Sequence, residues 1–121
     1  MIVMRPIAEP AVVEDLNRGR FAAPEGYVVM EGPEYLGYGL YAVADGVVQV
    51  LDCGGPLAEE KNGGVLDGLV RACAAAGQDC GAARFCVNAD NAALAHWWQV
   101  FCPGQTPPMA LDEFFGGCAH E

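Results

Sequence analysis

The fold is indicated most directly by residues 47–76, which read VVQVLDCGGPLAEEKNGGVLDGLVRACAAA. The first seven residues, Val47–Cys53, are mostly β-branched or apolar and predict a strand. After a glycine-rich loop, apolar side chains recur at positions 65, 66, 69, 70 and 73, on one face of a helix. Asn62 suits the start of this helix and Gly77 suits its end. The segment therefore predicts a strand, a loop and a helix in succession.

Further elements are expected on both sides of this segment. Upstream, the patterns predict strands over residues 2–7, 27–31 and 36–44 and a short helix over 10–18, with Pro6 favouring a sheet edge for the first strand. Asp45-Gly46 predicts an antiparallel hairpin into strand 47–53. Downstream, a strand over 84–88 precedes a helix that Asp90 can cap, and residues 109–115 fit a strand or a short helix.

This order of elements predicts one α+β (mixed α/β) domain over residues 1–121. We expect a central mixed, mostly antiparallel sheet flanked by helices. Strand 47–53, the following helix and strand 84–88 would form a β-α-β unit, because parallel neighbours need a crossover connection. The composition supports a packed core, since 53% of the residues are hydrophobic and 18% are charged.

Charge and missing residue types narrow the possible functions. The formal net charge is −10, which would repel the phosphates of nucleic acids and anionic membranes, so neither is expected as a partner. The sequence has no Ser, which excludes a serine nucleophile. Lys61 is the only lysine and Thr106 the only threonine.

The cysteines and the hydropathy pattern point to a soluble cytoplasmic chain. Six cysteines occur without a C-x-x-C pair or a Cys/His zinc spacing, and with only two histidines no metal site is expected. Residues 1–10 lack the apolar run of a secretion signal. No run approaches the roughly 18 consecutive apolar residues of a membrane helix. The thiols are therefore expected to be reduced, small buried side chains.

Two junctions between a strand and a helix could bind a ligand. Before the first helix, Gly63 and Gly64 allow backbone N–H groups to approach a phosphate, and Lys61 lies beside them. The alternative is an ordinary turn with a solvated lysine. At the second junction, Asn91 could reach into a cleft or could serve only as a local helix cap. Trp97 and Trp98 point about 100° apart, so we expect one of them to line a cleft or a subunit contact unless both flank a broad core.

Together these stretches resemble the GNAT family of N-acetyltransferases, over roughly residues 35–102. YLGYGL (35–40) is similar to the family's glycine-tyrosine strand, and residues 47–54 resemble its splayed fourth strand. Residues 87–98 are similar to the family pattern V-x-x-x-N-x-x-A-x-x-x-Y, with Asn91 on the Asn and Trp98 on the Tyr. The chain departs from the family pattern at Glu60, Val65 and Trp98.

The resemblance implies an acyl-CoA-dependent transfer of an acetyl group to an amine. It places the pyrophosphate of acetyl-CoA at the loop before the helix and pairs the pantetheine arm with the fourth strand. The cofactor-binding residues so implied are Leu51, Cys53, Lys61, Asn62, Gly63, Gly64, Val65, Asn91 and Trp98. Asp52 is the candidate catalytic base, with Glu31 acting through a water as a second choice. Both carboxylates could instead be solvated strand ends.

Several alternatives stay open. The acceptor could be a small-molecule amine or a protein amine, and the acidic chain would suit a cationic one. Because an indole cannot act as a general acid at the tyrosine position, the chain could instead be a non-catalytic ligand-binding or partner-binding module with the same fold. A third hypothesis makes thiols such as Cys53 and Cys102 a redox or metal site. Aromatic residues near the C-terminus are compatible with a homodimer.

Overall fold

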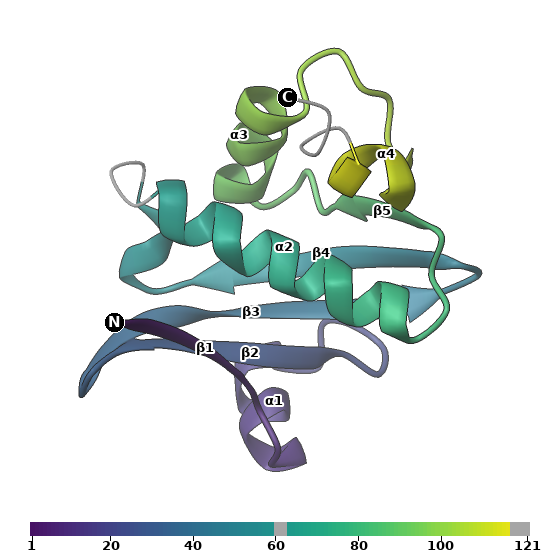
Figure 1. Cartoon of the computed structure of the whole chain (residues 1–121). Coiled ribbons are helices and arrows are strands. Elements are labelled where there is room, and N and C mark those ends of the chain that lie inside the picture. Colours follow the sequence, from purple (N-terminus) through teal and green to yellow (C-terminus); the bar gives the residue numbers. More distant parts are fainter. Residues whose placement is uncertain (60–62, 117–121) are drawn as a thin grey trace.

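The computed structural model describes residues 1–59 and 63–116 (Figure 1). In chain order its elements are β1 (Ile2–Pro6), α1 (Pro10–Asn17), β2 (Glu25–Glu31), β3 (Glu34–Ala44), β4 (Val47–Gly54), the 3-10 turn η1 (Pro56–Ala58), α2 (Gly63–Asp79), β5 (Arg84–Val87), α3 (Ala92–Phe101), β6 (Met109–Ala110) and α4 (Leu111–Gly116). Residues 109–115, which fitted either a strand or a helix, form two residues of strand followed by a short helix.

The six strands form one sheet in the order in which they occur in the sequence. All neighbouring pairs are antiparallel except β4 and β5, which are parallel and joined by α2. The expected α+β fold, with its mostly antiparallel sheet and its β-α-β unit, is confirmed. β1 lies at an edge, as Pro6 predicts. The hairpin between β3 and β4 turns at Asp45 and Gly46, whose φ angles of 55° and 77° are those of a type I′ turn.

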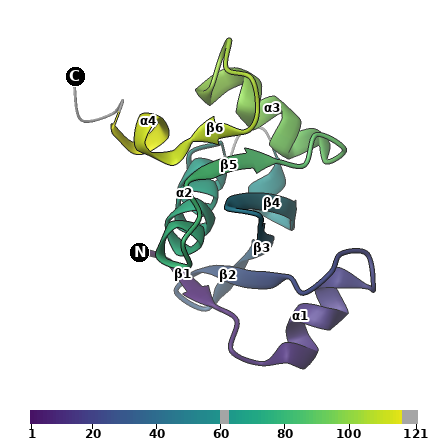
Figure 2. The same ribbon diagram turned by 90° about the vertical axis from the view of Figure 1, so that its right-hand side faces the viewer.

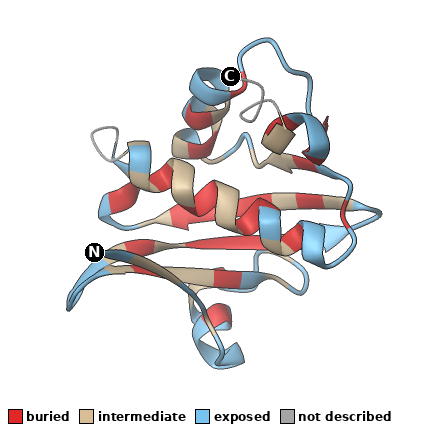
Figure 3. Cartoon of the chain, in the orientation of Figure 1, coloured by how far each residue is buried: buried red, intermediate tan, exposed pale blue. Residues whose placement is uncertain are grey.

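Helices cover the two faces of the sheet unequally. α2 crosses one face and carries the main core, to which α3 and α4 add an aromatic group around Phe85 and Trp97. α1 lies on the opposite side of the sheet (Figure 2), where Val13 packs with Leu40 and Leu51 in a second, smaller cluster. Figure 3 shows the buried positions concentrated between α2 and the central strands.

Gly77 is inside α2, so the prediction that it ends the helix is wrong. A Cβ atom at Gly77 would stand 2.3 Å from Cβ of Val48, which means that the glycine lets the helix approach β4 closely. The helix continues to Asp79 and ends before Gly81, which has a φ of 97°. α1 also ends shortly before a glycine: its last residue is Asn17, and Arg18, in the left-handed conformation, precedes Gly19.

An irregularity in β4 controls which side chains face α1. Leu40 pairs with Asp52 while the next residue of β3, Tyr41, pairs with Val50, so Leu51 is an extra residue and forms a β-bulge. Val50 faces the main core, whereas Leu51 belongs to the cluster under α1. Asp52, directly after the bulge, also faces the α1 side.

Candidate functional site

The pairing of the parallel strands β4 and β5 ends before β4 does, at the place where the resemblance puts a ligand. Their last paired residues are Val50 and Val87, and β4 continues for four further residues to Gly54. The backbone N–H of Asn88 makes the final ladder bond, to the carbonyl of Val50 at 2.8 Å. The end of β4 therefore extends beyond the paired part of β5.

Two asparagine side chains donate to carbonyl groups in this extended end of β4. Asn88 Nδ2 donates to the carbonyl of Leu51 at 3.1 Å, and Asn91 Nδ2 donates to the carbonyl of Cys53 at 3.3 Å. The carbonyl groups with which an extended ligand would pair are thus already hydrogen-bonded. A pantetheine arm would have to replace these amides or pass beside them.

Asn91 also caps α3. Its Oδ1 accepts from the backbone N–H of Leu94 at 3.1 Å, so the N-cap is Asn91 and the prediction of Asp90 as the cap is wrong. The backbone N–H of Asp90 instead donates to Oδ1 of Asn88 in a local turn. One side chain therefore joins the start of a helix to the end of a neighbouring strand.

Asp52 is the centre of a buried polar cluster, with 7% of its surface exposed. Its Oδ2 accepts from Tyr38 at 2.7 Å and from Nη2 of Arg20 at 2.8 Å, and its Oδ1 accepts from Nδ2 of Asn91 at 3.0 Å. Burial, followed by the hydrogen bond to Asp52, raises the pKa of Tyr38 to about 12. The same carboxylate raises the pKa of Arg20, mainly through its hydrogen bond.

The loop after α1, which the side chain of Asn17 fixes by hydrogen bonds, holds Arg20 against Asp52. Asn17, only 1% exposed, pairs with both backbone groups of Phe21, accepting from its N–H at 3.0 Å and donating to its carbonyl at 2.9 Å. Arg20 in turn donates to the carbonyls of Leu16 and Asn17, both at 2.9 Å. The guanidinium therefore caps the last carbonyls of α1 while it binds the carboxylate on β4.

A cavity of about 390 Å³ opens beside this cluster on the α1 side of the sheet. We name it the Asp52 cavity; it is lined by Arg20, Phe21, Leu51, Asp52, Asn88, Asp90 and Asn91. Its walls combine two carboxylates and one guanidinium with a phenyl ring and a leucine side chain.

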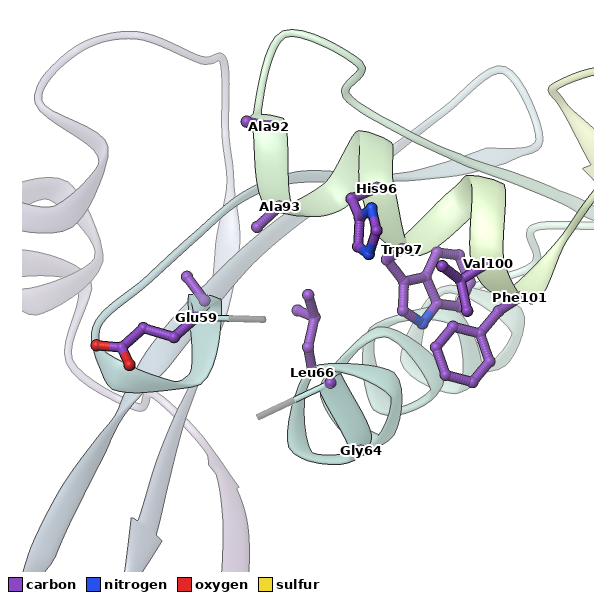
Figure 4. A pocket seen from close by; sticks show the side chains of 11 residues that line it. Glu59, Gly64, Leu66, Ala92, Ala93, His96, Trp97, Val100 and Phe101 are labelled. Carbon is purple, nitrogen blue, oxygen red and sulfur yellow. The ribbon is translucent and has the colours of Figure 1, made fainter. Parts of the chain in front are cut away.

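A second cavity, of about 460 Å³, lies between the start of α2 and one side of α3 (Figure 4). We name it the α2–α3 groove; its lining residues are Ala58, Glu59, Gly63, Gly64, Leu66, Ala92, Ala93, His96, Trp97, Val100 and Phe101. Most of these side chains are apolar. Figure 4 shows the imidazole of His96 pointing toward Leu66, and the carboxylate of Glu59 directed away from both of these side chains.

The implied cofactor residues fall into three groups. Asn91 and Asp52 are in contact, and Cys53 lies beside them with its thiol 3.7 Å from Oδ1 of Asn91. Gly63 and Gly64 line the α2–α3 groove. Lys61 and Asn62 lie outside the described residues.

Leu51 lines the Asp52 cavity, whereas Val65, Trp98 and Glu31 line neither cavity. Val65 is half-buried against the main core. Trp98 packs against Phe85 with the rings tilted and their centroids 5.4 Å apart, and its indole donates to the carbonyl of Gln105 at 3.2 Å. Glu31 ends β2 opposite Glu34 at the hairpin. Of the tryptophan pair, Trp97 is 2% exposed and lines the groove. Trp97 belongs to the main core and Trp98 packs against it, which matches the alternative that both flank a broad core.

Sequence reasoning missed Arg20 and Tyr38, two of the three side chains that donate to Asp52. Arg20 is 32 positions away in the chain and follows a loop in which no motif is visible, so only the tertiary contact reveals it. Tyr38 could have been found, because it alternates with Leu40 on a strand that pairs with β4. His96 could also have been placed beside the groove from its helical spacing to Ala92 and Ala93.

The described cysteines are buried except for Cys80, which is exposed, and Cys86, which is partly so. Burial raises the pKa of the Cys53 thiol to about 12 and that of Cys102 to about 11. Neither is therefore a thiolate at neutral pH. Within residues 1–59 and 63–116, no three His, Cys, Asp or Glu side chains gather closely enough to hold a metal ion.

No protein-family model, curated protein or solved structure matches the chain. Among the helices of the described ranges, none combines the length and the apolar content that crossing a bilayer requires.

Proposed function

We propose that the chain is an acyl-CoA-dependent N-acetyltransferase that moves an acetyl group from acetyl-CoA to an amine. One observation carries the proposal: two cavities of different chemistry are lined by consecutive residues at the start of α3. Asn91 lines the Asp52 cavity, and the two residues after it, Ala92 and Ala93, line the α2–α3 groove. This arrangement suits a reaction in which two substrates meet.

The α2–α3 groove fits the donor. Its apolar walls suit the methylene groups of a pantetheine chain, and the first N–H groups of α2 have no acceptor within the helix. Together with the helix dipole they favour a diphosphate. Gly63 and Gly64 would adjoin that diphosphate, and a Cβ atom at either position would have no described atom within 4 Å. When bound, acetyl-CoA supplies an activated acetyl thioester.

In this proposal Asp52 takes a proton from the acceptor amine. A carboxylate offers about four acceptor positions, and Arg20, Tyr38 and Asn91 occupy three of them. The position left over is on Oδ1, and the residue lines the Asp52 cavity. Overall, an ammonium and a thioester would give an amide and a free thiol, with a new C–N bond in place of the C–S bond and one proton released.

Direct binding of acetyl-CoA, measured by calorimetry, tests the donor site, and release of free thiol with an amine present tests the transfer. Gly64→Asp places a negative charge at the start of α2 and should weaken acetyl-CoA binding about tenfold relative to Gly64→Asn, its neutral match in shape. Absence of binding by the unmodified chain at millimolar acetyl-CoA, or equal affinity of the two variants, would overturn the proposal.

A second candidate is a non-catalytic module that binds a ligand or a partner in the same groove. It is favoured by Trp98, which stands at the position expected for the general acid yet packs on Phe85 and donates to Gln105. The hydrogen-bonded carbonyls of Leu51 and Cys53 favour it as well. Tight binding of acetyl-CoA without thiol release across a broad set of amines would identify this alternative.

A further inference from the structure

The chemistry of the Asp52 cavity indicates which class of amine it accepts. Three of its lining residues are ionisable: Arg20, Asp52 and Asp90. Arg20 and Asp52 form an ion pair at 2.8 Å and largely neutralise each other. Asp90 is exposed and makes no side-chain hydrogen bond or ion pair with the described residues. The cavity therefore presents one uncompensated negative charge.

The guanidinium cannot easily turn away to serve an anionic ligand. Its Nη2 already donates to Leu16 and to Asp52, and its Nε donates to Asn17. The loop that carries it is fixed by the buried Asn17. A carboxylate in the cavity would also meet Asp52 and Asp90, in a chain whose net charge is −10.

The apolar part of the Asp52 cavity restricts what the ligand can carry beside its ammonium group. Phe21 and Leu51 supply a surface against which a short methylene chain can pack. At about 390 Å³ the space lies at the low end of the range for small-molecule sites.

We propose that the Asp52 cavity is the acceptor site and takes a small alkyl amine or diamine that carries no carboxylate or phosphate. The ammonium group would face Asp90 and the remaining acceptor position of Asp52, with the methylene chain on Phe21 and Leu51. This inference rests on the proposed function, because it assigns the second substrate of the same reaction.

Calorimetry with 1,5-diaminopentane and with lysine tests the inference, because the two differ only by the α-carboxylate. Both are titrated into the protein without acetyl-CoA, so the result does not depend on whether the donor site works. The diamine should bind at least tenfold more tightly than lysine. Asp90→Asn should weaken diamine binding about fivefold, the effect of losing one exposed charge pair.

Asp45→Asn is the matched control, because it removes the same charge from the hairpin turn before β4, at the opposite end of the strand from Asp52. Asn also tolerates the positive φ of that position. Its affinity for the diamine should equal that of the unmodified chain. Three results would overturn the inference: no diamine binding, lysine binding as tight as the diamine, or equal affinities of the Asp90 and Asp45 variants. Failure of acetyl-CoA binding alone would count only against the donor site.

Discussion

Replacing Asn91 separates its two structural roles at the end of β4. The side chain accepts from the N–H of Leu94 as the cap of α3, and it donates to the carboxylate of Asp52 as the bridge to β4. Asn91→Ala removes both roles. Asn91→Ser keeps an acceptor for the cap and removes the bridge.

The two roles have different expected magnitudes. Loss of an N-cap costs about 1 kcal/mol, and loss of a hydrogen bond to a charged acceptor costs about 2 kcal/mol. The free energy of unfolding should therefore fall by about 3 kcal/mol in Asn91→Ala and by about 2 kcal/mol in Asn91→Ser. Asn88→Ala is a useful comparison, because that residue donates to the neutral carbonyl of Leu51, and it should cost only about 1 kcal/mol.

Urea unfolding followed by circular dichroism measures these differences, provided that the slope with denaturant stays constant across the variants. The free energy of unfolding should decrease in the order Asn88→Ala, Asn91→Ser, Asn91→Ala. If Asn91→Ser unfolds at the same urea concentration as the unmodified chain, the bridge to Asp52 contributes nothing. The interpretation of Asn91 as the residue that joins α3 to β4 would then be wrong.

Three other substitutions probe β3 and helix α2. Because the pKa of Tyr38 is raised to about 12, the neutral phenol stabilises the fold below pH 10, and this contribution is lost as the pH rises toward 12. The stability advantage of the unmodified chain over Tyr38→Phe should shrink by about 1 kcal/mol across that range. A constant difference between the two proteins would contradict this prediction. Gly77→Ala should lower stability by about 2 kcal/mol, because the new methyl group would clash with Val48. Gly64→Ala has open space around it and should raise stability by a few tenths of a kcal/mol. Shifts of the melting temperature in the same direction for both variants would refute this contrast.

The fold was predictable because its signals are local. The period of apolar residues identified α2, the Asp-Gly pair identified the hairpin, and Pro6 identified the edge strand. The errors also have a physical cause. Gly77 was assigned to a helix end from its residue type, but in the structure its missing side chain serves the contact with Val48. A glycine at a close approach and a glycine at a helix end look the same in sequence.

The candidate site was predictable only in part. Asn91 was identified from the junction after strand 84–88 and Asp52 from the resemblance, at the end of strand 47–53, and the structure brings them into contact. Arg20 was not, because it reaches Asp52 through a loop whose geometry depends on the buried amide of Asn17. The spacing of residues 17–21 does not predict that pairing. Strand ends can be derived from periodicity, whereas the loop that meets them requires tertiary structure.

The β-bulge at Leu51 explains why Asp52 can take part in a site at all. In a regular strand successive side chains alternate, and Val50 faces the main core, so Asp52 would face that core too. The extra residue reverses the alternation: Asp52 turns toward Arg20 and Tyr38, and Cys53 takes the place in the core. A carboxylate under α2 would lie among apolar side chains without these donors, at a cost of several kcal/mol. The same irregularity therefore orders the core and exposes the carboxylate to the Asp52 cavity, which is why a simple alternation pattern could not have predicted the site.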